Sequence, residues 1–357
     1  MKRDTSIDLL KSIAIMFVVL YHSNLFSSNF LDNDSCLFYI RYYIKTLLSS
    51  CVPLFFIANG YLLLSKPLQL KKHIRKIIHF MTITVIWSFL LVVLIMPIEH
   101  EAYSLSGIFN AIIQMRVGWT NHLWFMGALV CLYYFFPLIK IVYDSNKLVF
   151  YYFTVICVIL SFGNSLLNEG ATLFSSILLK KNTVYYNSNF FLFFNPFNVH
   201  AESFAYFCIG GVLFSIKDRL HNITVCRHIV YSVFLIILGS TILFVIGVYN
   251  SKLSNAIFDI VFNSYSTVFT LFISLGIWSL CLLYQKDIYI IREISCNTLG
   301  IYMFHVIIIN LTKPYFIQFP LCRTLSFNIA YTIAILLICL FISKGLKTIP
   351  FISRIVS

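Results

Sequence analysis

Three ionisable side chains, Asp8, Lys11 and His22, lie within one apolar stretch near the start of the chain. A charged group inside a bilayer costs about 2.5–3.5 kcal/mol to insert, so each of them needs an explanation. Lys11 and His22 are eleven residues apart. That spacing is close to three helical turns, so both side chains face one way, roughly 16 Å apart along the axis. Asp8 precedes Lys11 by one turn and is placed to pair with it.

This polar stripe has two interpretations. In the first, Asp8 and Lys11 lie at the membrane interface, and His22 only hydrogen-bonds to another helix. In the second, the stripe faces a water-filled cavity and the three residues are catalytic. Imidazole exchanges protons near neutral pH, so His22 could act as a general base on a hydroxyl group or carry an acyl group transiently.

A second group of candidates lies in the segment 66–76, where Lys71, Lys72, Arg75 and Lys76 fall within six positions. Cytoplasmic loops of membrane proteins carry an excess of such residues for topological reasons alone. Contact with anionic lipid is another explanation. A third is an anion site for the phosphates of coenzyme A, because Lys and Arg bind phosphate well.

The elements that must position these residues are membrane helices. Of the 357 residues 60% are apolar and 11% are charged, whereas soluble domains average about 25% charged. Continuous apolar blocks of helical length predict an all-α polytopic membrane bundle of about ten helices in one domain, residues 1–357. The expected spans are 7–26, 46–65, 77–97, 122–142, 147–167, 201–216, 228–248, 263–284, 295–312 and 325–344.

The charge distribution predicts the orientation. With the N-terminus in the cytoplasm, inner segments hold seventeen Lys and Arg and outer segments eight, so both termini are expected inside. The basic residues lie mainly in short loops between apolar blocks, which argues against a nucleic-acid-binding face despite the net charge of +13. The ten Cys are scattered without metal-ligand spacing, so no metal is expected. Membrane lipid is the expected surrounding, and the oligomeric state is left open.

Two outer loops are long: the loop near 98–121 ends in the segment Gly118–Trp124, and the loop near 168–200 is rich in Asn and aromatic residues. These residue types suit the hydroxyls and faces of sugars, but an ordinary interfacial aromatic belt explains them equally well. Glu202 is a candidate for contact with an acceptor, and His305 either completes a polar cavity with His22 or packs between helices. His122 is expected to be an interfacial residue without a special role.

Five short segments, in order along the chain, are similar to motifs of the acyltransferase family 3 membrane proteins. They are Lys11 with His22, Phe55–Tyr61, Lys72–Arg75, Leu123–Phe125 and Tyr302–His305. The chain departs from the family's usual pattern by having Lys11 and Lys72 for Arg and Asn59 for Ser. The resemblance covers nearly the whole chain.

The resemblance implies a multi-pass protein of the bacterial inner membrane that moves an acetyl group from cytoplasmic acetyl-CoA to a glycan. The acceptor would be a cell-surface polysaccharide such as O-antigen, or its lipid-linked precursor. It assigns catalysis to His22, Lys11 and Asp8, and the donor phosphates to the basic segment. The residues expected to contact the acceptor are Trp124, Glu202, Tyr302 and His305.

Two other classes of protein share these features. A glycan flippase or transporter also has many helices, basic inner loops and buried ionisable residues, although no internal repeat is visible here. A glycan polymerase would be expected to have a dominant outer loop rich in Arg, and the segment 168–200 has only Lys180 and Lys181.

Overall fold

The computed structural model describes residues 3–23, 29–32, 35–99, 104–114, 122–177, 190–191, 201–221, 223–350 and 353. Every regular element within these ranges is helical, which confirms the predicted all-α bundle. The α-helices are α1 (Thr5–Ser23), α2 (Cys36–Leu48), α3 (Cys51–Leu64), α4 (Leu70–Glu99), α5 (Leu105–Gln114), α6 (Trp124–Ser145), α7 (Lys147–Val158), α8 (Asn164–Ile177), α9 (Ala201–His221), α10 (Val225–Ser254), α11 (Val268–Leu282), α12 (Tyr289–Cys296), α13 (Thr298–Phe316) and α14 (Leu325–Lys347). A π-helical turn, Ile159–Gly163, joins α7 to α8.

The structure does not confirm the predicted number of membrane spans. Seven helices in the described ranges are long and apolar enough to cross a membrane, or eight if the bent pair α12–α13 is one span, so the count of about ten is not confirmed. Two of the expected spans correspond to α9 and α11. α11 has only 15 residues, and α9 ends in a charged segment that includes Lys217, Asp218 and Arg219.

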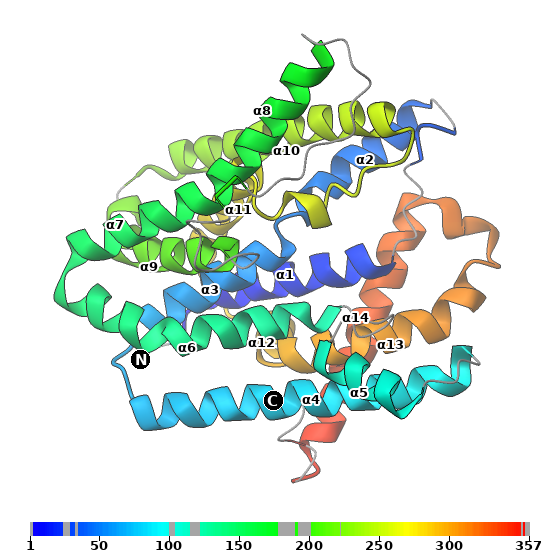
Figure 1. Ribbon diagram of the computed structural model, residues 1–357, viewed down its shortest axis with the longest axis horizontal. Helices are drawn as coiled ribbons and strands as arrows, with labels where there is room; N and C mark the ends of the chain where they lie inside the picture. The colour runs from blue at the N-terminus through cyan, green and yellow to red at the C-terminus, as the bar shows by residue number, and fades with distance from the viewer. Residues whose placement is uncertain are drawn as a thin grey trace.

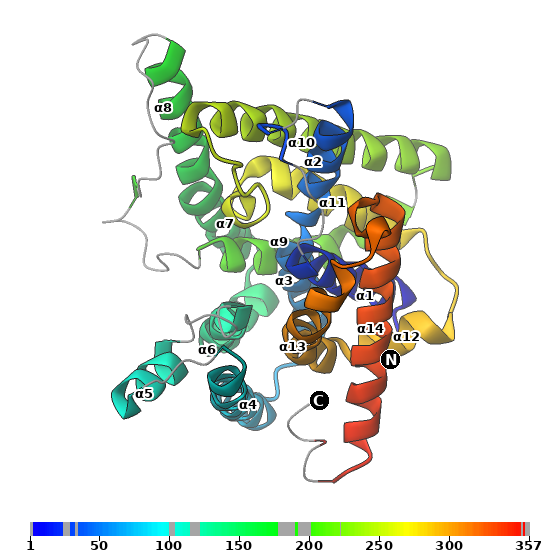
Figure 2. The same cartoon turned by 90° about the vertical axis from the view of Figure 1, so that its right-hand side faces the viewer.

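α1 and α3 lie in the middle of the molecule (Figure 1). α4, α5 and α6 lie on one side of them, and α2, α10 and α11 lie on another (Figure 2). α1 contacts α3, α11, α12, α13 and α14. The outer helices expose apolar side chains, such as Phe234 and Val245 of α10 and Phe341 of α14, as expected for surfaces that face lipid.

Glycines allow two helix pairs to approach closely. A Cβ atom on Gly60 of α3 would collide with the carbonyl oxygen of Phe207 on α9, and one on Gly239 of α10 would collide with that of Phe269 on α11. Apolar burial does not drive association inside lipid, so small residues that bring backbones together supply packing instead. Each of these close pairs includes a helix that contacts α1, namely α3 and α11.

Two helices are interrupted near α1. The predicted span 46–65 begins earlier, at Cys36, and breaks at Ser49 and Ser50, whose hydroxyls donate to the carbonyls of Thr46 and Leu47 at 2.7 Å. α12 and α13 meet at an angle of 79°, and there the Asn297 amide donates to the Glu293 carbonyl at 2.8 Å. Side chains thus satisfy backbone groups that the breaks release.

Candidate active site

A cavity of about 540 Å³ lies at the C-terminal end of α1, where His22 points into it. Its walls come from α1, the α2–α3 break, the start of α6, the loop 255–267 and α13. The polar and aromatic lining includes Tyr21, His22, Lys45, His122, Trp124, Asp259, Tyr302 and Asn310. A cavity of this volume with a few convergent polar groups is typical of a small-molecule site.

Three histidines from separate parts of the chain meet at this cavity. The ring centroid of His22 is 5.0 Å from that of His305 and 6.2 Å from that of His122, and the last two are 5.3 Å apart. His22 and His122 line the cavity, whereas His305 is fully buried behind them. His122 was expected to be an interfacial residue, but the structure buries it and brings it to His22.

The hydrogen bonds of His305 fix its tautomer. Its Nδ1 lies 2.6 Å from the carbonyl oxygen of Tyr302, and a carbonyl only accepts, so Nδ1 carries the proton. In the neutral ring Nε2 is then an acceptor, and it has no hydrogen-bond partner among the described residues. The Tyr302 hydroxyl donates to the carbonyl oxygen of His122. Next to His22, His305 thus presents an acceptor nitrogen, Nε2, whose lone pair makes no hydrogen bond among the described residues.

Asp259 is a lining residue that the motifs did not indicate. It follows α10 in the loop 255–267, and its Oδ2 accepts from the Tyr21 hydroxyl at 2.7 Å. Tyr21 precedes His22, and their ring centroids are 5.0 Å apart. Lys45 lines the same cavity from α2, although its segment was expected to be a loop. The sequence gives only a weak signal for Asp259, namely a single Asp next to apolar residues in a loop.

The predicted acceptor-side residues do not all meet here. Trp124 lines the cavity with its ring centroid 5.7 Å from that of Tyr265, and Tyr302 lines it too. His305 is behind the wall. Glu202 lies in the first turn of α9 and is not among the lining residues that the structure describes. Most residues of the two long loops near 98–121 and 168–200 lie outside the described residues, including 115–121 and 178–189.

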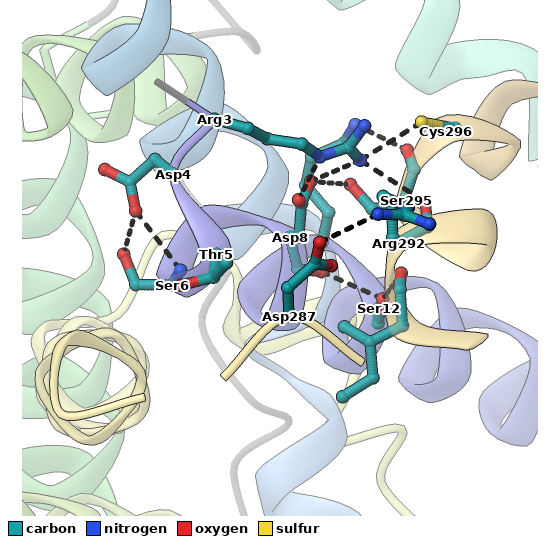
Figure 3. A network of polar contacts seen from close by, with 12 residues as sticks. Arg3, Asp4, Thr5, Ser6, Asp8, Ser12, Asp287, Arg292, Ser295 and Cys296 are labelled. Atoms are coloured by element: carbon teal, nitrogen blue, oxygen red, sulfur yellow. Dashed lines mark hydrogen bonds and ion pairs between the residues drawn. The ribbon is translucent and has the colours of Figure 1, made fainter. Parts of the chain in front are cut away.

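At the opposite end of α1, Asp8 belongs to a different network, together with Arg3 and Ser295 (Figure 3), and Lys11 also contacts Ser295. Asp8 forms an ion pair with Arg3 and accepts from the Ser295 hydroxyl at 2.6 Å. The expected Asp8–Lys11 pair is therefore wrong, because Arg3 takes the carboxylate and Lys11 Nζ donates to the Ser295 carbonyl at 2.6 Å. The hydrogen bond that Arg3 donates to Asp8 raises the pKa of the Arg3 guanidinium above its ordinary value. The guanidinium therefore stays charged.

This network fastens α12 to α1. Lys11 of α1 and Lys347 of α14 donate to the carbonyls of Ser295 and Cys296 in the last turn of α12, and Arg3 donates to the Arg292 carbonyl just before that turn. The carbonyls at a helix C-terminus lack helical partners and carry partial negative charge, so cations stabilise them.

The basic segment divides into two halves. Lys72 and Lys76 line a second pocket of about 410 Å³ together with Lys66, Gln69 and His73. Lys71 and Arg75 are exposed, as Lys72 is, but they are not among the described lining residues of this pocket.

Lys76 connects this pocket to the interior. Its Nζ donates to the Tyr133 hydroxyl at 3.2 Å, and Tyr133 donates to Asn59 Oδ1 at 3.0 Å. A polar link therefore runs from α4 through α6 to α3. It ends at Asn59, the residue that stands where the similar family motif has Ser.

Comparison with known proteins identifies a family for this chain. Residues 4–344 match the family model for the acyltransferase family 3 domain, described as an acyltransferase domain. No curated protein and no solved structure matches the chain.

Proposed function

The chain belongs to acyltransferase family 3, and we propose that it is an O-acetyltransferase that moves an acetyl group from acetyl-CoA to a glycan hydroxyl. The acceptor is a cell-surface polysaccharide of the O-antigen type or its lipid-linked precursor. The protein lies in the bacterial inner membrane with both termini in the cytoplasm. The cavity that joins His22, His122 and Trp124 is the observation that carries this proposal.

The chemistry proposed for the cavity is general-base catalysis. The neutral imidazole of His22 takes the proton of the acceptor hydroxyl while the hydroxyl oxygen forms a bond to the thioester carbonyl carbon. The tetrahedral intermediate then breaks its C–S bond, and the leaving thiolate takes the proton back from the imidazolium. The ring centroid of His305 is 5.0 Å from that of His22. His305 gives the His22 imidazole a polar setting and does not contact the acceptor.

Acceptor binding is assigned to the aromatic walls of the cavity. Trp124 and Tyr302 present rings to the space next to His22. Aromatic rings suit the apolar faces of sugars, while lining hydroxyl and amide groups suit sugar hydroxyls.

Donor binding is assigned to the pocket beside the basic segment. Lys72 and Lys76 supply two positive charges to one space of about 410 Å³, which suits the phosphates of coenzyme A. α3 connects the two pockets, because Asn59 takes part in the Lys76 link and Phe55 lies 5.8 Å from the cavity residue Phe125 between ring centroids. We assign the pantetheine arm of coenzyme A to the path along α3 between the two pockets.

Asp8 and Lys11 receive a positioning role. Along α1, Lys11 lies roughly 16 Å and Asp8 roughly 21 Å from His22, and both are occupied by contacts with Arg3 and Ser295. In this proposal they fix α12 against α1, and through it the start of α13, which carries Tyr302 and His305.

The proposal is tested with the purified protein in lipid nanodiscs, acetyl-CoA labelled in the acetyl group, and a lipid-linked glycan fraction from bacterial membranes. Transfer of label to the glycan by the wild type, and loss of transfer in His22→Ala with unchanged folding, is the expected result. A flippase moves the glycan without labelling it, so unlabelled glycan from the wild type would overturn the proposal.

A further inference from the structure

The most informative feature outside the predicted motifs is the carboxylate of Asp259 in the wall of the cavity. One of its oxygens, Oδ1, accepts from the backbone N–H groups of Val261 and Phe262 at 3.1 and 3.3 Å. The other, Oδ2, accepts from the Tyr21 hydroxyl at 2.7 Å. The bonds to the backbone N–H groups shape the turn in the loop. The bond from Tyr21 directs the other carboxylate oxygen toward the residue that precedes His22.

Turn formation does not require the charge. The neutral oxygen of Asn makes the same bonds to backbone N–H groups. Within the described part of the chain no Lys or Arg forms an ion pair with Asp259. Lys45 lines the same cavity, and it too is without an ion pair among those residues. An exposed carboxylate and an ammonium group in one cavity, not paired with each other, leave both charges available to an occupant.

The loop that carries Asp259 is fixed from three directions. Tyr42 donates to the Phe258 carbonyl at 2.9 Å, the Phe258 N–H donates to Ser251 Oγ at 2.9 Å, and Tyr206 donates to the Tyr265 carbonyl at 2.8 Å. The position of the carboxylate is therefore set before any ligand binds. Such preorganisation lets a polar group select ligands at little entropic cost.

We propose that Asp259 and Tyr21 form an acceptor-recognition pair, which binds a sugar hydroxyl other than the one that reacts and so presents the reacting hydroxyl to His22. This inference rests on the proposed function. A carboxylate has about four acceptor positions and three are used here, so at least one lone pair remains for a donor hydroxyl. The Tyr21 oxygen, which donates to Asp259, accepts from the same ligand. The ligand class is a neutral polyol such as a hexose.

The recognition pair predicts selectivity for substrates that have the bound hydroxyl. A site built to hydrogen-bond a hydroxyl rejects an analogue that lacks it, because the polar group of the site is left unpaired. A bond to a charged partner corresponds to roughly a tenfold or greater change in affinity. Loss of the carboxylate should therefore raise the KM for the acceptor and leave the KM for acetyl-CoA unchanged.

The experiment uses the full-length protein in nanodiscs with labelled acetyl-CoA and a panel of methyl hexopyranosides and their monodeoxy analogues as acceptors. Asp259→Asn keeps the turn and Tyr21→Phe removes only the hydroxyl. Asp287→Asn is the control in an exposed loop, where the carboxylate pairs with Arg292 and is not among the described lining residues of the cavity. We expect roughly tenfold higher acceptor KM in the first two variants, with kcat little changed. One monodeoxy analogue should lose about tenfold with the wild type and lose nothing further with Asp259→Asn.

Two failures are distinguishable. If the wild type labels neither the hexosides nor the lipid-linked glycan, the proposed function fails and the recognition pair with it. If the wild type labels a hexoside but Asp259→Asn and Tyr21→Phe keep its acceptor KM, only the recognition pair is wrong. An equal loss on every deoxy analogue in wild type and Asp259→Asn would also overturn it.

Discussion

The two ends of α1 carry similar polar residues and use them in opposite ways. At the Lys11 end, neighbouring elements bind the polar groups: Lys11 and Ser12 donate to carbonyls of α12, and Asp8 is held by Arg3 and Ser295. At the His22 end, the helix meets a cavity of about 540 Å³. Buried ionisable groups with a full set of partners stabilise the fold, whereas those that face open space are available for chemistry.

The largest effect should come from His22. Because His22 lines a cavity instead of filling a packed interface, His22→Ala should lower kcat by about 10²–10⁴-fold, the usual contribution of a general base. The thermal midpoint of the detergent-solubilised protein should change little. Transfer assays and thermal denaturation of the same preparation measure both quantities. Activity close to that of the wild type would remove the distinction between the two ends.

Lys11 should behave in the opposite manner. Lys11→Met removes a charged donor and leaves the Ser295 carbonyl without it, so we expect a loss of about 1.5–3 kcal/mol in the free energy of unfolding. Activity per folded molecule should fall much less than in His22→Ala, and Lys11→Arg should restore most of the stability. An inactive Lys11→Met protein with wild-type stability would instead place Lys11 in the chemistry.

A similar contrast, between residues that line a pocket and residues that do not, applies to the basic segment. Lys72→Ala with Lys76→Ala should raise the Kd for acetyl-CoA by about tenfold or more, because both line the second pocket and a charge-assisted phosphate contact contributes about that factor. Lys71→Ala with Arg75→Ala removes the same charge from positions that do not line this pocket and serves as the matched control. Equal effects in the two double variants, measured by calorimetry of acetyl-CoA binding, would favour a general electrostatic role.

The smallest effect should come from Lys347. It also donates to the end of α12, at 3.1 Å to the Cys296 carbonyl, but this hydrogen bond is exposed to solvent. Lys347→Met should therefore cost about 1 kcal/mol or less. Denaturation alongside Lys11→Met tests whether burial sets the size of the contribution, and a larger loss for Lys347 would contradict it.

Several features could be predicted from the sequence because they depend on local composition and spacing. The long apolar blocks are sufficient to predict helices. The eleven-residue spacing of Lys11 and His22 places both on one face of α1, which the helix Thr5–Ser23 retains. The basic segment was found in the same way, by the density of charge between two spans.

Other features depend on contacts between distant residues, so they needed the tertiary structure. Asp8 pairs with Arg3 instead of Lys11 because Ser295, 284 residues along the chain from Lys11, occupies the lysine. His122 and Asp259 reach His22 only because α6, α13 and the loop 255–267 close around the end of α1. Spacing along a helix sets which way a side chain points, but the packing of other helices decides whether it meets a partner or an open cavity.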